Sequence, residues 1–227
     1  MARKNTEPLL QRNDPDGEPL IGNTKVTRQD WLNVAMDILI SDGVEQVKVL
    51  TVGERLNVSR SSFYWYFKSR QDLLNALLQH WGETNTAALV RQAELPADTI
   101  TAAICNVFRC FVDDSLFNTW LDFAIREWAR RSGSVRRVLD QSDETRLAAL
   151  EAMFARYGYS PSEALTRARV LYYMQIGYTL AELNEPLSQR LKMVPNYLHA
   201  FTGRHAGPEE VNALRDYAIT ASRRAKS

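Results

Sequence analysis

The sequence predicts an all-α protein, and three observations lead to this fold class. From Thr27 to the end of the chain, apolar residues recur at spacings of three and four, which is typical of helices with one buried face. Glycine, proline and serine separate the resulting segments. Alternating strand patterns are absent, and the β-branched cluster from Val44 to Val52 is too short and too charged to anchor a sheet.

The composition is that of an ordinary folded chain, with 227 residues, 45% hydrophobic and 24% charged. This length allows one domain or two unequal ones. No apolar run approaches the roughly 18 residues of a membrane span, and the chain does not start like a signal peptide. Cys105 and Cys110 are too few for a disulfide framework. We therefore expect a cytoplasmic protein without a membrane partner.

The first helix begins with a predicted capping box, in which Thr27 caps the helix and Asp30 reaches back to it. Gly43 is expected to end this helix in the left-handed conformation. Its buried face comprises Trp31, Val34, Ala35, Ile38 and Leu39.

The next segment has the features of a helix-turn-helix. The apolar face of a short helix is formed by Val49, Val52 and Leu56. Gly53 lies where a side chain would hold two helices apart, and Asn57 enters a left-handed turn cheaply. Ser59 is then expected to cap a second short helix. A small residue, a left-handed turn and a capped short helix together favour this motif.

The second short helix is the candidate DNA-reading element. Phe63 and Phe67 are expected to face inward, while Lys68 and Arg70 form a phosphate clamp with the start of the following helix. The outward side chains, suited to phosphates, thymine methyls and base edges, are Arg60, Ser61, Ser62, Tyr64, Trp65 and Tyr66. The alternative is that residues 63–67 are an aromatic core segment, although so short a helix can bury only one side.

Further helices follow to the end of the chain. Ser69, with Asp72, is expected to cap a helix that carries Leu73, Leu77 and Trp81 on one face and runs to about Gln92. The remaining predicted helices span 97–114, 117–131, 135–157, 161–183, 187–201 and 208–224.

The net charge of +1 conceals an uneven distribution. Residues 1–47 carry five basic and eight acidic side chains, whereas residues 48–70 carry five basic side chains and Glu54 alone. From Gln71 onward, eighteen charges of each sign cancel. This asymmetry indicates a small anion-binding module on a neutral body, although a solvated basic face explains it as well.

The segment from Val26 to Trp81 resembles the amino-terminal domain of TetR-type (tetracycline-repressor-like) transcriptional regulators. Positions 57–74 read N-V-S-R-S-S-F-Y-W-Y-F-K-S-R-Q-D-L-L, which matches that family's run in Val58-Ser59, Phe63-Tyr64, Tyr66-Phe67, Ser69 and Leu73. The chain departs from the family pattern at Gly53 (usually alanine), Asn57 (glycine), Tyr66 (often histidine) and Arg70 (lysine).

The resemblance implies a domain organisation and a function. Residues 1–23 read as a disordered arm, residues 24–70 as a three-helix DNA-binding domain, and residues 71–227 as a helical effector-binding and dimerisation domain. The implied protein is a homodimeric repressor that a small-molecule effector releases from palindromic double-stranded DNA. A reading helix this short also needs a partner copy for useful specificity.

The residues of the effector pocket and of the dimer interface are less determined. We expect the pocket to involve Phe108, Trp120, Phe123, Tyr173 and Tyr178, although aromatics at helical spacing more often form a core. The interface is expected in helices 161–183 and 187–201, where an intramolecular core explains the apolar residues equally well: Leu171, Met174, Ile176, Leu180, Leu191, Val194 and Leu198.

Other functions are less well supported by the residues. Asp122 and Glu127 lie among aromatic residues. Either one of them is a carboxylate in an apolar site, or they form surface ion pairs with Arg126, Arg130 or Arg131. His80, His199 and His205 lack metal-ligand spacing, and no catalytic signature is recognisable, so we expect no enzyme activity, metal or cofactor. A helical ligand-binding or adaptor protein whose amino-terminal domain does not bind DNA is the main alternative, and a small all-α enzyme a weaker one.

Overall fold

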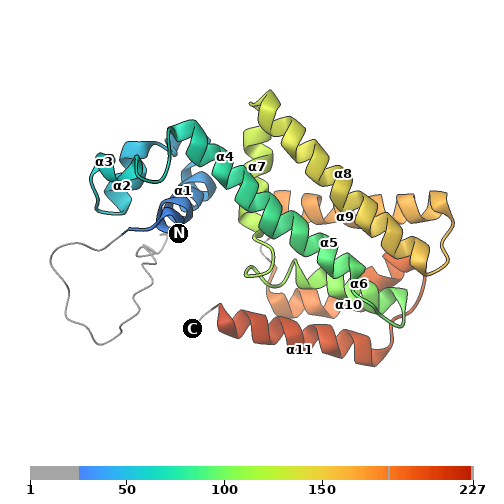
Figure 1. Ribbon diagram of the computed structural model, residues 1–227. Coiled ribbons are helices and arrows are strands. Elements are labelled where there is room, and N and C mark those ends of the chain that lie inside the picture. The colour runs from blue at the N-terminus through green and yellow to red at the C-terminus, as the bar shows by residue number, and fades with distance from the viewer. Residues whose placement is uncertain (1–25, 184, 226–227) are drawn as a thin grey trace. The chain divides into compact units, whose positions relative to one another are not determined.

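The computed structural model describes residues 26–183 and 185–225, and within these residues the regular structure is helical throughout (Figure 1). The predicted arm, residues 1–23, lies outside the described residues. Contacts divide the chain into an N-terminal unit up to Gln79 and a C-terminal unit from His80. No helix of residues 26–183 and 185–225 combines the length and hydrophobicity that a membrane span requires.

The N-terminal unit is built from short helices. It contains α1 (Arg28–Asp42), a 3-10 turn (Val44–Gln46), α2 (Val49–Arg55), α3 (Arg60–Phe63) and most of α4 (Arg70–Trp81). The predicted boundary between residues 70 and 71 falls at the start of α4, whereas the observed division lies after Gln79. The difference arises because α4 carries Leu73, Leu74 and Leu77, which are buried and are not part of the core of the C-terminal unit.

The start of α1 has the predicted capping box. The Thr27 hydroxyl accepts a hydrogen bond from the Asp30 N–H at 3.2 Å, and the Asp30 carboxylate accepts one from the Thr27 N–H at 2.7 Å. The predicted end of the helix is only partly right. Gly43 has a positive φ of 82°, but its ψ of 168° lies outside the left-handed helical region. This extended mirror conformation is still one that glycine adopts far more easily than other residues.

The predicted close approach at Gly53 is present. A Cβ at this position would lie 3.3 Å from the Val58 carbonyl oxygen and 3.4 Å from Cη2 of Trp31, whose side chain is fully buried. The turn that follows places Asn57 at a φ of 54°, as predicted. The missing side chain at position 53 therefore lets α2 lie close to both Trp31 of α1 and the turn carbonyl of Val58.

The C-terminal unit starts within one long helical stretch. After α4, a π-helical turn (Gly82–Thr86) leads directly into α5 (Ala87–Glu94), so the predicted long helix is present with one turn widened. The later helices are α6 (Ile100–Arg109), α7 (Thr119–Ala129), α8 (Gly133–Arg156), α9 (Pro161–Leu180), α10 (Leu187–Thr202) and α11 (Pro208–Arg224). The predicted helix 97–114 was too long because Thr99 caps α6 and irregular turns follow Arg109.

The helices of the C-terminal unit enclose one apolar core. α8 lies along α5, α7 and α9, while α11 packs on α6 (Figure 1). Leu171, Leu191, Val194 and Leu198 are buried in this core, so their apolar character is explained within one chain. Leu180 is exposed and does not belong to it.

The close approach at Gly53 generates a stability prediction. Gly53→Leu should lower the free energy of unfolding by about 1–3 kcal/mol, because the larger side chain must displace Trp31 or the turn carbonyl. Gly133→Leu is the matched control, since a Cβ at the first residue of α8 meets no atom within 4 Å, and it should change stability by less than about 0.5 kcal/mol. Equal effects of the two substitutions in urea denaturation would contradict this account of the packing.

Candidate nucleic-acid interface and ligand cavity

The helix-turn-helix orients its aromatic residues to opposite sides. Phe63 and Phe67 are buried, and the Phe63 ring packs edge-on against Trp31 at 5.2 Å between centroids. Trp65, by contrast, is 85% exposed, and Tyr64 is also exposed. The segment is therefore not simply a core segment, because its inward face is filled by two rings while two others lie in solvent.

The exposed side chains form the candidate reading surface. Arg60, Ser61 and Lys68 are exposed, and Ser62 is half-buried. An Arg60 N–H donates to the Tyr64 hydroxyl at 3.2 Å. Ser59 stands at the predicted cap position of α3, but its hydroxyl pairs with that of Ser61 at 2.8 Å and not with the backbone, which corrects the predicted cap. The exposed surface of this segment thus combines two aromatic rings with several hydrogen-bond donors.

Two residues of the predicted reading set are engaged inside the N-terminal unit. The Tyr66 hydroxyl donates to the Val26 carbonyl, at the entry to α1. The Arg70 guanidinium donates to the carbonyls of Val44 and Val47, both at 2.6 Å. These bonds tie the segment after α3 to the backbone that precedes α1 and α2, so Tyr66 and Arg70 hold the candidate reading surface in position.

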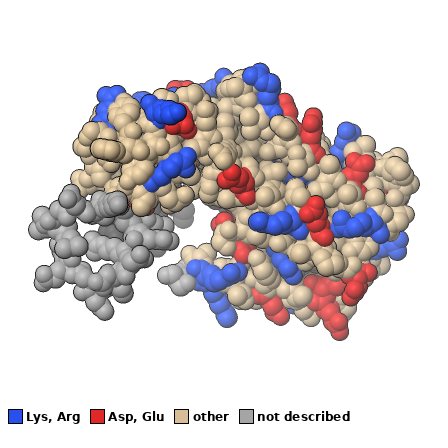
Figure 2. All heavy atoms as spheres, in the orientation of Figure 1, with Lys and Arg blue, Asp and Glu red and all other residues tan. Residues whose placement is uncertain are grey.

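Charges on the C-terminal unit are not segregated by sign, in contrast to the basic side chains of residues 48–70. Figure 2 shows acidic and basic side chains interspersed over the face of this unit that is visible there. This agrees with the equal numbers of each sign from Gln71 onward.

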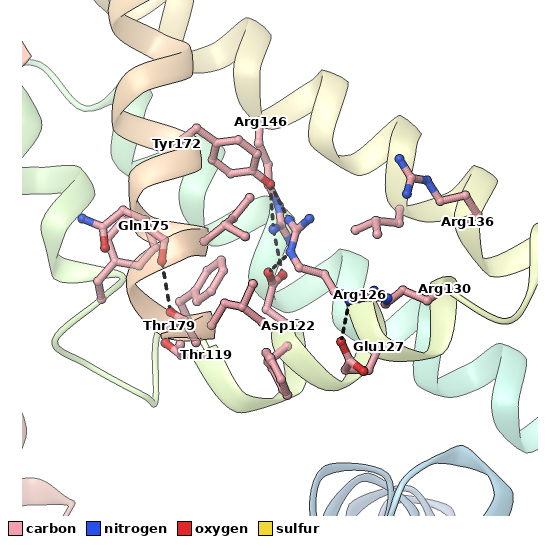
Figure 3. A pocket seen from close by; sticks show the side chains of 16 residues that line it. Thr119, Asp122, Arg126, Glu127, Arg130, Arg136, Arg146, Tyr172, Gln175 and Thr179 are labelled. Carbon is pink, nitrogen blue, oxygen red and sulfur yellow. Dashed lines mark hydrogen bonds and ion pairs between the residues drawn. The ribbon is translucent and has the colours of Figure 1, made fainter. Parts of the chain in front are cut away.

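The C-terminal unit holds a cavity of about 420 Å³ between α7, α8 and α9 (Figure 3). Its walls combine apolar side chains with an unusual number of charged ones. The apolar group comprises Phe111, Phe117, Phe123, Leu139, Ile176 and Leu180, and the charged group comprises Asp122, Arg126, Glu127, Arg130, Arg136 and Arg146. Its volume lies within the range of small-molecule sites, and the space is partly open to solvent.

The predicted pocket residues do not all lie in this cavity. Phe123 lines it, but Phe108 and Tyr178 line a neighbouring space of about 50 Å³. Trp120 borders a third depression together with Tyr178, and Tyr173 is 52% exposed on α9. The five aromatics therefore do not form one pocket, because they project from different faces of their helices.

A buried polar network forms part of the cavity wall, and sequence reasoning missed most of it. The Asp122 carboxylate accepts hydrogen bonds from Arg146 at 2.7 Å and from Arg126 at 3.0 Å. Arg126 also forms a two-pronged ion pair with Asp143, at 2.7 and 3.0 Å. Tyr172 donates to Asp143 at 2.6 Å. Figure 3 shows Asp122, Arg126, Arg146 and Tyr172 converging from three helices.

The network keeps Asp122 ionised. Burial opposes the charge, but Arg146 and Arg126 outweigh it, so the pKa of Asp122 lies below its ordinary value. Burial raises the pKa of Tyr172, so this hydroxyl remains a hydrogen-bond donor. The predicted ion pair of Asp122 with Arg126 is confirmed, but it is buried, whereas Glu127 pairs with Arg130 near the surface.

The same network holds the end of α4. The indole N–H of Trp81, the last residue of α4, donates to Asp122 at 2.9 Å. In the following π-helical turn, the buried Asn85 side chain exchanges two hydrogen bonds with the backbone of Asn118, which caps α7. One carboxylate on the cavity wall is therefore directly bonded to the helix that begins in the N-terminal unit.

Removing the negative charge of Asp122 should destabilise the protein. Asp122→Asn should lower the free energy of unfolding by about 3–5 kcal/mol at neutral pH, because it leaves the buried Arg146 without its anion. Since the folded-state pKa lies below 3.8, the stabilisation is complete above that pH and is lost as the pH falls from 3.8 toward the folded-state value.

Urea denaturation at several pH values measures this difference. Asp140→Asn serves as the control, because the pair of Asp140 with Arg136 is exposed and should contribute less than about 1 kcal/mol. Equal losses for the two variants, or a difference that does not shrink in acid, would contradict the role of Asp122.

Comparison with known proteins agrees with this architecture. Residues 32–77 match the family described as bacterial regulatory proteins, tetR family. The chain is 26% identical over 159 residues to the tetracycline repressor protein class A from transposon 1721 of Escherichia coli, a match that covers 70% of this chain and 68% of the relative.

Solved structures share the fold of the chain. A transcriptional regulator from Rhodococcus sp. Rha1 superposes with a TM-score of 0.58 at 19% identity, covering 83% of this chain and 96% of the other. A transcriptional regulator from Aquifex aeolicus VF5 has a TM-score of 0.55 at 16% identity, covering 78% and 96%. Residues 32–77, which contain the helix-turn-helix, thus match the DNA-binding domain of the tetR family, and the chain as a whole is similar to a TetR-family transcriptional regulator.

Proposed function

We propose that this regulator is a homodimeric repressor, which leaves a palindromic operator when a small molecule occupies the cavity between α7, α8 and α9. The observation that carries this proposal is the Trp81–Asp122 hydrogen bond, which ties the end of α4 to the cavity wall. The similarity to a tetracycline repressor also supports it, because that relative is by name a repressor.

DNA contact is assigned to the exposed side of residues 60–68. Arg60 and Lys68 supply charge for phosphates or a guanine edge, and the two serines let the backbone come close to the groove. Tyr64 and Trp65 offer rings for sugars and thymine methyl groups. A tryptophan exposed to this extent is poorly placed in water, so coverage by DNA gives it a favourable environment.

Ligand binding acts on DNA through two states of the protein. An effector that fills the cavity contacts side chains of the Asp122 network. Because Trp81 is bonded to Asp122, an effector that favours a different arrangement of the network also favours a different position of α4. The effector needs only a higher affinity for the state in which the two reading surfaces of a dimer no longer fit one operator.

The dimer surface is assigned to α9. Val170, Tyr173 and Leu180 are exposed and lie along one side of this helix, with Gly177 exposed between them. Apolar side chains in such a row are typical of a surface that another copy covers. Most of the interface residues expected from sequence are used in the core, so this row is the more specific proposal.

The adaptor alternative remains distinguishable from the regulator. An adaptor has no need of an exposed Trp65 beside basic side chains and should bind DNA weakly and without sequence preference. Specific, salt-sensitive binding to the region upstream of its own gene or of a neighbouring gene favours the regulator.

The DNA-reading role of Trp65 can be tested directly. Trp65→Ala should weaken binding to a specific operator fragment at least about tenfold, because a ring that contacts DNA is lost. Its salt dependence should stay unchanged, since no charge is removed, whereas Lys68→Ala should reduce the slope of log K against log salt by about one.

Fluorescence anisotropy over a salt series gives both quantities. Trp120→Ala is the control, because this tryptophan is 48% exposed but lies on α7 of the C-terminal unit. If Trp65→Ala and Trp120→Ala bind the operator as tightly as the unsubstituted protein, the assigned surface is wrong.

The dimer surface generates a separate prediction. Tyr173→Glu should convert the dimer into a monomer at micromolar concentration, because each protomer would bury an unpaired carboxylate in the interface. Ile219→Glu on α11 also replaces an exposed apolar residue and should leave the dimer intact. Light scattering coupled to size exclusion measures the mass, and a dimer that survives Tyr173→Glu would exclude α9.

A further inference from the structure

One charged group on the cavity wall lacks a hydrogen-bond partner. Arg146 lines the cavity, and its side chain is 0% exposed. Within the described part of the chain, its terminal nitrogen Nη2 has no hydrogen-bond partner. Leaving a buried charged donor unsatisfied costs about 1–3 kcal/mol or more, and water cannot reach this nitrogen to satisfy it.

The rest of the Arg146 guanidinium is held firmly. Its Nε donates to Thr86 at 3.1 Å, and Nη1 donates to Asp122 and Tyr172 at 2.7 and 3.3 Å. Trp81 and Phe117 stack against it at 4.9 and 5.3 Å from their ring centroids. With every other contact made, Nη2 cannot turn toward a different partner without breaking the network.

The neighbouring acceptors are already in use. One oxygen of Asp122 accepts from Trp81 and Arg146, and the other accepts from Arg126. Both oxygens of Asp143 accept from Arg126, and one also accepts from Tyr172. None of these oxygens accepts from Nη2, so we look for its acceptor in a bound ligand.

The other walls restrict the character of that acceptor. Arg126, Arg130, Arg136 and Arg146 line the cavity together with only two carboxylates, Asp122 and Glu127. Arg126 is also paired with Asp143, Arg130 with Glu127 and Arg136 with Asp140, so the group that favours an anionic ligand over a cationic one is the unpartnered Nη2 of Arg146. The apolar walls, especially Phe123, Leu139 and Ile176, require an apolar body next to the charge.

We infer that the cavity binds an amphipathic organic anion, with its apolar body between α7, α8 and α9 and an anionic oxygen that accepts a hydrogen bond from Nη2 of Arg146. This inference rests on the proposed effector site and specifies the class of its ligand. Because Nη2 is closed to water, the anion reaches it only when the side chains beside it shift, and Trp81 stacks on the same guanidinium.

A pair of fluorescent probes tests the need for the anion. 1-Anilinonaphthalene-8-sulfonate and N-phenyl-1-naphthylamine share one apolar body, but only the first carries an anionic group. The unsubstituted protein should bind the sulfonate with one site per protomer and at least about tenfold more tightly than the neutral probe, as expected for a charge-assisted hydrogen bond. Equal affinities would overturn the inference, and no variant is needed for this comparison.

Substitutions then assign the site. Arg146→Lys keeps the charge but loses the second nitrogen, so it should weaken the sulfonate about tenfold and leave the neutral probe within about twofold. Arg137→Lys is the matched control, because Arg137 is an exposed arginine of the same helix that does not line the cavity, and it should leave both probes unchanged. Ile176→Trp should weaken both probes by filling the cavity. Unaltered sulfonate binding in Arg146→Lys and Ile176→Trp would overturn the site.

Anisotropy of operator DNA in the same samples separates this inference from the proposed function. If the sulfonate binds through Arg146 but the saturated protein stays on the operator, the inferred ligand class is supported, whereas the proposed release of DNA by a cavity ligand is contradicted for this probe. If release occurs with both probes to the same extent, the cavity is an effector site but the anion is not required, which contradicts the inference.

Discussion

The buried ion pair between Asp122 and Arg146 is the interaction on which the C-terminal unit depends. Taking two charges out of water is expensive, and the cost is offset only when their remaining hydrogen bonds are satisfied. The pair joins α7 to α8. Most of its remaining hydrogen bonds are made with Trp81 from α4, Arg126 from α7 and Tyr172 from α9. The register of four helices is thereby fixed at one point, and that point is the wall of the cavity.

The N-terminal unit is organised by a simpler constraint, which is space. Gly53 lets α2 approach Trp31 and the turn carbonyl of Val58, and Phe63 packs edge-on against the same indole. Because Phe63 and Phe67 fill the inside, the intervening Tyr64 and Trp65 point outward. Tyr66 and Arg70 complete the arrangement through backbone carbonyls. The exposure of the proposed reading surface is thus a consequence of how the interior is filled.

Sequence reasoning succeeds where the physical cause is local. The capping box at Thr27, the left-handed Asn57 and the inward Phe63 each follow from neighbours within a few positions. It fails for the cavity, because which aromatics share a wall depends on the rotation of distant helices. Arg146 did leave a signal: it occupies a position in the buried row of α8 that otherwise carries Val135, Leu139 and Leu150. An arginine in such a row requires a partner, although the sequence does not name it.

The Asp122–Arg146 ion pair on the cavity wall is connected to α4 through the hydrogen bond from Trp81. ¹⁹F NMR of protein labelled with 5-fluorotryptophan, with resonances assigned by Trp→Phe substitution, tests this most directly. Titration with 1-anilinonaphthalene-8-sulfonate should shift the Trp81 resonance, because its indole is bonded to Asp122 and stacks on Arg146, and should leave the exposed Trp65 unchanged. A Trp81 resonance that does not move while the cavity becomes saturated would contradict the connection.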